Sequence, residues 1–176
     1  MEEIVVVSCT NRPNSNTLKV SKIYAGILKS KNKDVKILDF CDLPENIAFG
    51  EVFGKRSDEY QAFIEKFVAK NRKFIFVVPE YNGSFPGILK TFLDSIQPKD
   101  WNFKDACIVG VSSGRAGNLR GLEHLNGILS YLKMHVFYNR LPISMVDKII
   151  NLEGNFTHDD QMQACIHQID GFIANR

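Results

Sequence analysis

Short apolar runs alternate with segments of helical periodicity along the whole chain. The run Ile4-Val5-Val6-Val7 is β-branched and continuously apolar, which is typical of a strand buried on both faces. Apolar positions then recur every three or four residues from Val20 to Leu28, which predicts an amphipathic helix. This alternation predicts further strands at residues 35–38, 74–78 and 106–111 and a short one within 135–145. It also predicts helices starting near residues 57, 86 and 157, and one with an apolar stripe from Leu122 to Leu132.

Capping residues support three of these helix starts. Ser57 precedes two acidic residues and is expected to cap the second helix, while Pro86 suits the first turn of the third. Thr157, with Asp160 three residues later, is expected to open the last helix as a capping box. Residues 41–57 contain proline and two glycines without apolar periodicity, so we expect irregular structure there.

Five strand–helix units without a long linker predict one domain over residues 1–176. Right-handed crossovers then require a parallel sheet with helices on both faces, a three-layer α/β sandwich. The flavodoxin-like strand order 2-1-3-4-5 fits five strands best. In that order the switch point lies between the first and third strands, and ligands bind outside the carboxyl ends of the strands.

Composition limits the partners that we expect. The 176 residues are 44% hydrophobic and 24% charged with a net charge of +2, which favours a soluble protein without a nucleic-acid or membrane partner. Four widely spaced cysteines predict neither a disulfide framework nor a metal site. No signal peptide is recognisable at Met1, so we expect a cytoplasmic protein.

The loop after the first strand has the chemistry of an anion site. It contains no glycine, so it is neither of the common glycine-rich phosphate loops. It runs directly into the first helix, whose free N–H groups favour an anion. Ordinary capping needs one or two donors, but this loop has Arg12 and five others: Thr10, Asn11, Ser15, Asn16 and Thr17. We interpret it as a phosphate-binding loop.

The loops after the third and fourth strands are less specific. Residues 79–87 contain two prolines and two glycines, whose backbone can take positive φ or approach a flat ligand, and Tyr81 offers an aromatic face. A simple turn before a helix explains them equally well. Residues 112–118 are small and leave room for a ring, and Arg115 can meet a phosphate, although glycine-rich helix entries are common.

Together the three loops resemble those of the NADPH-dependent FMN reductases, a family of flavin, azo-dye, quinone and chromate reductases. The resemblance spans residues 4 to 132. It rests on Ser8, Arg12 and Ser15, on Pro79-Glu80-Tyr81-Asn82-Gly83-Ser84 with the following Pro86-Gly87-Ile88-Leu89-Lys90, and on Ser113-Gly114-Arg115 with Gly117. The central stretch is its most specific element, and it favours the ring-binding interpretation of the second loop.

The resemblance implies a role for each loop toward a tightly bound FMN. The phosphate would be held from the first loop by Ser8, Thr10, Arg12, Ser15, Asn16 and Thr17. The ring would be contacted from the second loop by Pro79, Glu80, Tyr81, Asn82 and Gly83. Ser112, Ser113 and Gly114 would lie along the ring's other side, with Arg115 as a contact for the NADPH phosphate.

The implied activity is hydride transfer from NADPH (or NADH) to FMN, followed by reduction of a free flavin, quinone, azo compound or metal oxyanion. The cofactor carries this chemistry, so no catalytic acid or base is required. The resemblance also implies a homodimer or homotetramer with the flavin near the interface. Trp101 and Phe103 either contribute to that interface or pack under a loop.

Two alternatives remain open. A flavodoxin-type electron carrier would bind FMN without turning over a small substrate, but such carriers are typically acidic and this chain has a net charge of +2. The second alternative is a relative of the same fold that binds no flavin. The three loops argue against it, because they would then have no ligand in common.

Overall fold

The sheet has six strands, and every strand pair in it is parallel. The computed structural model describes residues 3–174. The strand order is β2-β1-β3-β4-β5, with β6 also paired to β4, so the predicted order 2-1-3-4-5 is confirmed. The strands are β1 (Ile4–Ser8), β2 (Val35–Asp39), β3 (Lys73–Pro79), β4 (Asp105–Val111), β5 (His135–Val136) and β6 (Leu141–Ile143).

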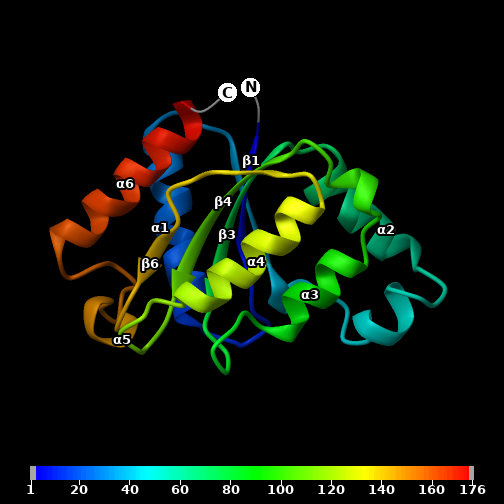
Figure 1. The fold of residues 1–176 in the computed structure, drawn as a ribbon, viewed down its shortest axis with the longest axis horizontal. Helices are drawn as coiled ribbons and strands as arrows, with labels where there is room; N and C mark the ends of the chain where they lie inside the picture. Colours follow the sequence, from blue (N-terminus) through cyan, green and yellow to red (C-terminus); the bar gives the residue numbers. More distant parts are fainter. Residues whose placement is uncertain (1–2, 175–176) are drawn as a thin grey trace.

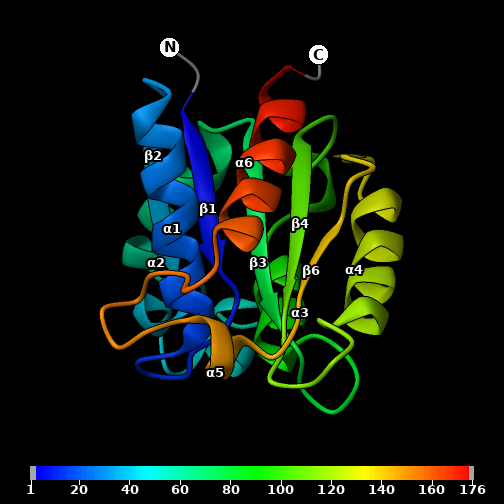
Figure 2. The same ribbon diagram turned by 90° about the vertical axis from the view of Figure 1, so that its left-hand side faces the viewer.

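The helices form a layer on each face of this sheet (Figures 1 and 2). One layer holds α1 (Asn16–Ser30) and α6 (Asp159–Ala174). The other holds α2 (Asp58–Ile64, continued by a π-helical turn over Glu65–Ala69), α3 (Gly87–Asp94) and α4 (Leu119–Tyr131). The remaining α-helix, α5 (Val146–Ile149), is a single turn that follows β6. No helix within residues 3–174 has the length and apolar character needed to cross a membrane.

The two layers produce two hydrophobic cores because successive strand residues point to opposite faces. In β1, Val5 and Val7 pack against α2, α3 and α4, while Ile4 and Val6 pack against α1 and α6. All four are buried. Strands buried on both faces must be apolar throughout, and this explains the continuous apolar runs in the sequence.

The end of the sheet differs from the single fifth strand that we expected. Two short strands, β5 and β6, replace it, and both pair with β4. Pro142 lies inside β6 opposite Gly110. Proline cannot donate a ladder hydrogen bond, so it is tolerated only where one side of the strand is unpaired, as at this sheet edge.

The start of the last helix was also predicted wrongly. Ser57 caps α2, with its Oγ accepting from the Tyr60 N–H at 3.2 Å, as expected. Thr157 does not cap α6, which begins at Asp159. Instead the Thr157 N–H and hydroxyl both donate to the Ile149 carbonyl, at 2.9 and 3.3 Å. They tie this loop to α5, a competing local hydrogen bond typical of threonine.

Trp101 belongs to the core and is not at an exposed surface. It is fully buried, with its ring 5.6 Å from Phe74 and 6.1 Å from Phe92 between centroids. Phe103 is 58% exposed and has a positive φ. Trp101 therefore packs in the core against β3 and α3, and its burial excludes a contact with a second subunit.

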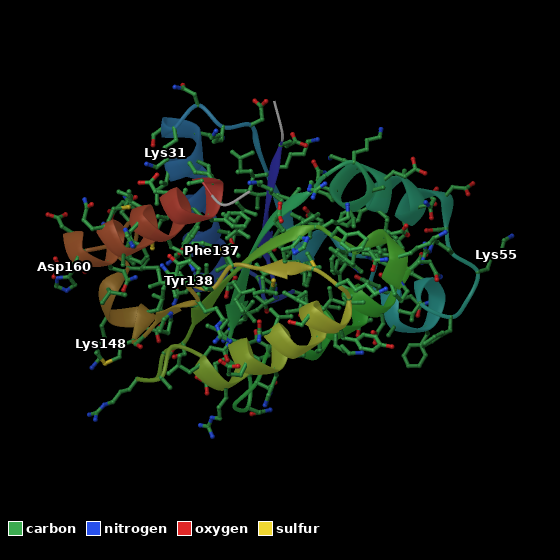
Figure 3. All side chains as sticks on the ribbon, turned by 45° about the horizontal axis from the view of Figure 1, so that its top comes forward. Lys31, Lys55, Phe137, Tyr138, Lys148 and Asp160 are labelled. Atoms are coloured by element: carbon green, nitrogen blue, oxygen red, sulfur yellow. The ribbon has the colours of Figure 1, made fainter. Side chains whose placement is uncertain are left out.

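A buried polar network fixes α6 to the sheet. The Tyr24 hydroxyl on α1 donates to Gln168 Oε1 on α6 at 2.5 Å. Gln168 Nε2 then donates to the carbonyls of Ile108 and Asn139, at 3.2 and 2.8 Å. Nearer the end of α1, Lys31 (labelled in Figure 3) pairs with Asp170 at 2.7 Å. These contacts hold α6, which follows the long segment after β6, against α1.

Candidate functional site

The three predicted loops meet in one pocket at the carboxyl ends of β1, β3 and β4. Its volume is about 320 Å³. The pocket therefore lies at the switch point between β1 and β3, where ligands bind in sheets of this order. It is lined by Arg12, Pro13, Asn14, Ser15, Asn16, Thr17, Pro79, Glu80, Tyr81, Val111, Ser112, Ser113, Val146 and Asp147.

The first loop presents the amino end of α1 to this pocket. Ser15 is the N-cap, and its Oγ accepts from the Leu18 N–H at 3.1 Å. The N–H groups of Asn16 and Thr17 have no acceptor within the helix, because the first turn lacks preceding carbonyls. Arg12 adds a guanidinium at the rim. These are the groups that an anion binds at a helix N-terminus.

Ser8 and Thr10 are buried beside the pocket and are not part of its lining. The hydroxyl of Ser8 has no hydrogen-bond partner among the described residues. Thr10 Oγ1 accepts from the Arg12 N–H at 3.2 Å and is 2.8 Å from the Tyr81 hydroxyl. Thr10 therefore shapes the loop and connects it to the second loop.

The second loop turns through a two-residue hairpin. Asn82 and Gly83 both have positive φ, 50° and 76°, as the type I′ Asn-Gly turn requires. The Tyr81 N–H donates to the Ser84 carbonyl at 2.8 Å, and the Ser84 N–H returns the bond at 3.0 Å. Only Pro79, Glu80 and Tyr81 line the pocket, so Asn82 and Gly83 form the tip outside the lining.

The third loop contributes two serines. Ser112 and Ser113 line the pocket, whereas Gly114 and Arg115 do not. Gly117 has a φ of +58°, and a Cβ there would lie 2.5 Å from the Pro142 Cβ, so it packs against β6. The Asn118 amide donates to the Val78 carbonyl at 3.0 Å and holds the loop to the end of β3. These contacts direct Gly117 away from the pocket.

Five lining residues were not predicted as site residues. Pro13, Asn14 and Val111 lie within or beside the predicted loops, whereas the other two come from a segment that the sequence patterns did not indicate. Val146 and Asp147 come from α5, and the Asn16 amide nitrogen donates to Asp147 Oδ1 at 2.6 Å. The Val146 N–H donates to the Ser112 carbonyl at 3.0 Å. One signal could have located them, because they follow the last strand at the same sheet edge as the other loops.

The donors of the lining suit a phosphate at one end and a flat ring at the other. Arg12 carries the one positive charge among the lining residues, and Glu80 and Asp147 carry the two negative charges. Free helix N–H groups, a serine hydroxyl and a guanidinium are suited to phosphate. Pro79 and Glu80 offer backbone groups to a ring edge. The residues present therefore fit FMN.

The nearby cysteine has no reactive role in this site. Cys9 directly follows β1 and is buried, with its N–H donating to the Val77 carbonyl at 3.0 Å. Burial raises the pKa of the Cys9 thiol well above its usual value, so it remains a thiol at neutral pH. Cys9 therefore supports the fold beside the site and takes no part in its chemistry.

Comparison with known proteins agrees with this geometry. A 2-hydroxy-1,4-benzoquinone reductase from a Burkholderia species is 29% identical over 128 residues, 69% of each chain. An FMN-dependent NADPH-azoreductase from Staphylococcus saprophyticus is 27% identical over 135 residues, 75% of this chain and 71% of the relative.

Solved structures show the same fold. The NAD(P)H:(acceptor) oxidoreductase FerB of Paracoccus denitrificans superposes with a TM-score of 0.82 at 18% identity, covering 99% of this chain and 96% of that one. A short-chain flavodoxin superposes with a TM-score of 0.63 at 12% identity, covering 98% and 96%. The family described as NADPH-dependent FMN reductase matches residues 3–148, which include all three loops and the first part of α5. The chain belongs to the NADPH-dependent FMN reductase family.

Proposed function

We propose that this protein binds FMN in the three-loop pocket, accepts reducing equivalents from NADPH or NADH, and reduces a small acceptor. The observation that carries the proposal is the pocket itself, because residues from all three loops line one cavity. Family membership makes the chain an FMN-dependent oxidoreductase with NAD(P)H as the electron donor. Bound FMN supplies hydride acceptance and electron delivery.

The protein's own residues hold and orient the cofactor in this proposal. Arg12, the Ser15 hydroxyl and the first N–H groups of α1 bind the phosphate. Pro79, Glu80 and Tyr81 border the ring on one side, and Ser112 and Ser113 border it on the other. Residues 1–176 act as one FMN-binding domain.

The acceptor class follows from the relatives rather than from a contact in this chain. Quinone and azo-compound reduction are named for two relatives that are 29% and 27% identical to this chain. We therefore propose a free flavin, quinone, azo compound or metal oxyanion as the acceptor. The electron-carrier alternative is favoured by the flavodoxin structures, but these show only the fold, and the net charge of +2 does not suit docking on basic partners.

One experiment separates the two functions. The purified protein, loaded with FMN under anaerobic conditions, is mixed with NADPH or NADH while its visible absorbance is recorded. An NAD(P)H reductase loses its yellow colour at once. A carrier keeps the colour with NAD(P)H and loses it only with a chemical reductant such as dithionite. A protein that retains no flavin contradicts both functions.

We also propose that two copies pair through the groove between α3 and α4, as a homodimer or as half of a homotetramer. The groove has a volume of about 380 Å³ and a largely apolar wall that includes Leu93, Ile128 and Tyr131. Tyr131 is 83% exposed. On α3, Lys90 and Asp94 lie at the groove in a 2.7 Å ion pair, and this arrangement of opposite charges is complementary to a second copy of itself.

The interface has a matched control. Tyr131→Glu places a charge in the groove and is expected to yield monomers in light scattering after size-exclusion chromatography. Tyr138 (labelled in Figure 3) is 82% exposed but lies outside this groove, so Tyr138→Glu is expected to leave the mass unchanged. A monomeric parent protein would contradict the interface.

The cytoplasm is the compartment that we propose. All four cysteines are free thiols, and three of them are buried. Thiols persist in reducing compartments. Fractionation of cells that produce the protein at its natural level tests this location.

A further inference from the structure

A carboxylate lies beside the phosphate-binding donors. Asp147 lines the pocket and accepts from the Asn16 side-chain amide at 2.6 Å, although the two residues are 131 positions apart. Asn16 is the first residue of α1, so its amide lies where the helix N-terminus favours an anion. In this structure the anion at that amide is the protein's own carboxylate.

The backbone that precedes Asp147 is hydrogen-bonded to the third loop. The Met145 N–H donates to the Gly114 carbonyl at 2.9 Å, and the Val146 N–H donates to the Ser112 carbonyl at 3.0 Å. Met145 also has a φ of 48°, a conformation that costs energy for a residue with a side chain. These bonds keep the backbone at Asp147 beside the third loop, at the edge of the pocket.

The charged residues that line the pocket have a net negative charge, which is unfavourable for a phosphate dianion near Asp147. Arg12 is the one cation in the lining, against Glu80 and Asp147. Glu80 belongs to the second loop, whereas Asp147 contacts Asn16 at the end of the first loop. Lys148, the next residue of α5, lies at the periphery of the molecule in Figure 3 and does not line the pocket. Like charges a few ångströms apart repel, most strongly at low ionic strength.

We propose that Asp147 sets the FMN affinity by opposing the phosphate that Asn16 and the α1 N-terminus attract. The proposal rests on the proposed FMN site. The carboxylate competes with the phosphate for the Asn16 amide and repels its charge, so FMN is held less tightly than the donors alone would allow. Riboflavin has the same ring and polyol without the phosphate, so its binding does not depend on this charge.

Asp147→Asn is the informative variant. It removes the charge but keeps a carbonyl oxygen that can accept from Asn16. Flavin-free protein is titrated with FMN and with riboflavin, and the quenching of flavin fluorescence gives each Kd. We expect the Kd for FMN to fall by about 3- to 10-fold at low ionic strength and the gain to shrink in high salt. The Kd for riboflavin is expected to stay the same.

The control removes an equal charge elsewhere. Asp160, labelled in Figure 3, is exposed at the start of α6 and does not line the pocket, so Asp160→Asn should leave both Kd values unchanged. An unchanged or higher Kd for FMN in Asp147→Asn overturns the proposal. A higher Kd for both flavins would mean that Asp147 accepts from the polyol instead. A parent protein that binds neither flavin overturns the proposed function itself.

Discussion

The Thr10 side-chain oxygen and the Tyr81 hydroxyl lie 2.8 Å apart, and this hydrogen bond joins the first loop of the pocket to the second. Thr10 is buried, and its oxygen also accepts from the Arg12 N–H at 3.2 Å. The position of Arg12 therefore depends on a tyrosine in another loop. The two ends of the pocket are connected directly, in addition to their common attachment to the sheet.

Tyr81→Phe is expected to weaken FMN binding without removing the aromatic ring. Loss of one hydrogen bond corresponds to about 0.5–1.5 kcal/mol, so the Kd for FMN should rise by about 2- to 10-fold. Fluorescence titration measures this change. Thr10→Ser, which keeps the hydroxyl, serves as the control and should bind FMN like the parent. Equal affinity in Tyr81→Phe would show that the bond does not support the site.

Gly117→Ala is expected to destabilise the third loop. Its Cβ would lie 2.5 Å from the Pro142 Cβ at a φ of +58°. Overpacking and positive φ together should lower the free energy of unfolding by about 2–4 kcal/mol. Gly114→Ala is the matched control three residues away, because its Cβ would meet only Ser112 Oγ at 3.9 Å. Urea denaturation of both variants compares them. Equal denaturation midpoints for the two variants would mean that β6 shifts to accommodate the added methyl group at little cost in stability.

Tyr24→Phe is expected to lower stability without changing the pocket. Burial raises the pKa of Tyr24 well above its usual value, so the hydroxyl stays protonated and donates to Gln168. Its removal leaves the buried Gln168 Oε1 without that donor, a cost of about 1–3 kcal/mol. Thermal unfolding should detect the loss. Tyr138→Phe, at a residue that is 82% exposed, should be neutral, and a comparable loss there would contradict the assignment.

Cys41 is expected to be the one thiol that reacts in the folded protein. It is exposed, and the other three cysteines are buried. Partial burial and the neighbouring carboxylates of Asp39 and Asp42 raise the pKa of the Cys41 thiol. Its reaction with Ellman's reagent should therefore keep accelerating at pH values where free cysteine has levelled off.

Two variants check this thiol. Cys41→Ser should abolish the fast reaction, while Asp39→Asn should speed it by lowering the pKa. Unfolding should expose the three buried thiols and raise the total of reactive thiols in the parent protein to four. More than one fast thiol in the folded protein would mean that a buried cysteine becomes accessible through local opening.

The pattern of apolar runs was sufficient for the sheet order and for the position of the site. Strands buried on both faces leave a continuous signal, and the topology then requires a switch point beside Ser15 and Pro79. The positive φ of Gly83 also followed from its residue type. These features depend on local chemistry and on general rules of chain connection.

Features that depend on distant contacts escaped prediction. The helical turn α5 has only four residues, too few for a periodic signal, and Asp147 reaches Asn16 through tertiary structure alone. Arg115 lies outside the pocket lining, in a loop whose course is set by Gly117 against Pro142 and by the Ser144 hydroxyl, which donates to the Arg115 carbonyl at 2.7 Å. Trp101 fills the core because three phenylalanines surround it.

The contact between Asn16 and Asp147 has a consequence for biosynthesis. During translation, the first loop of the pocket leaves the ribosome when only a small part of the chain exists, whereas α5 follows more than a hundred residues later. The wall formed by Val146 and Asp147 is absent until then. A nascent chain that stops before β6 has the donors for an anion but no complete cavity. The complete lining of the pocket therefore requires nearly the whole chain through α5.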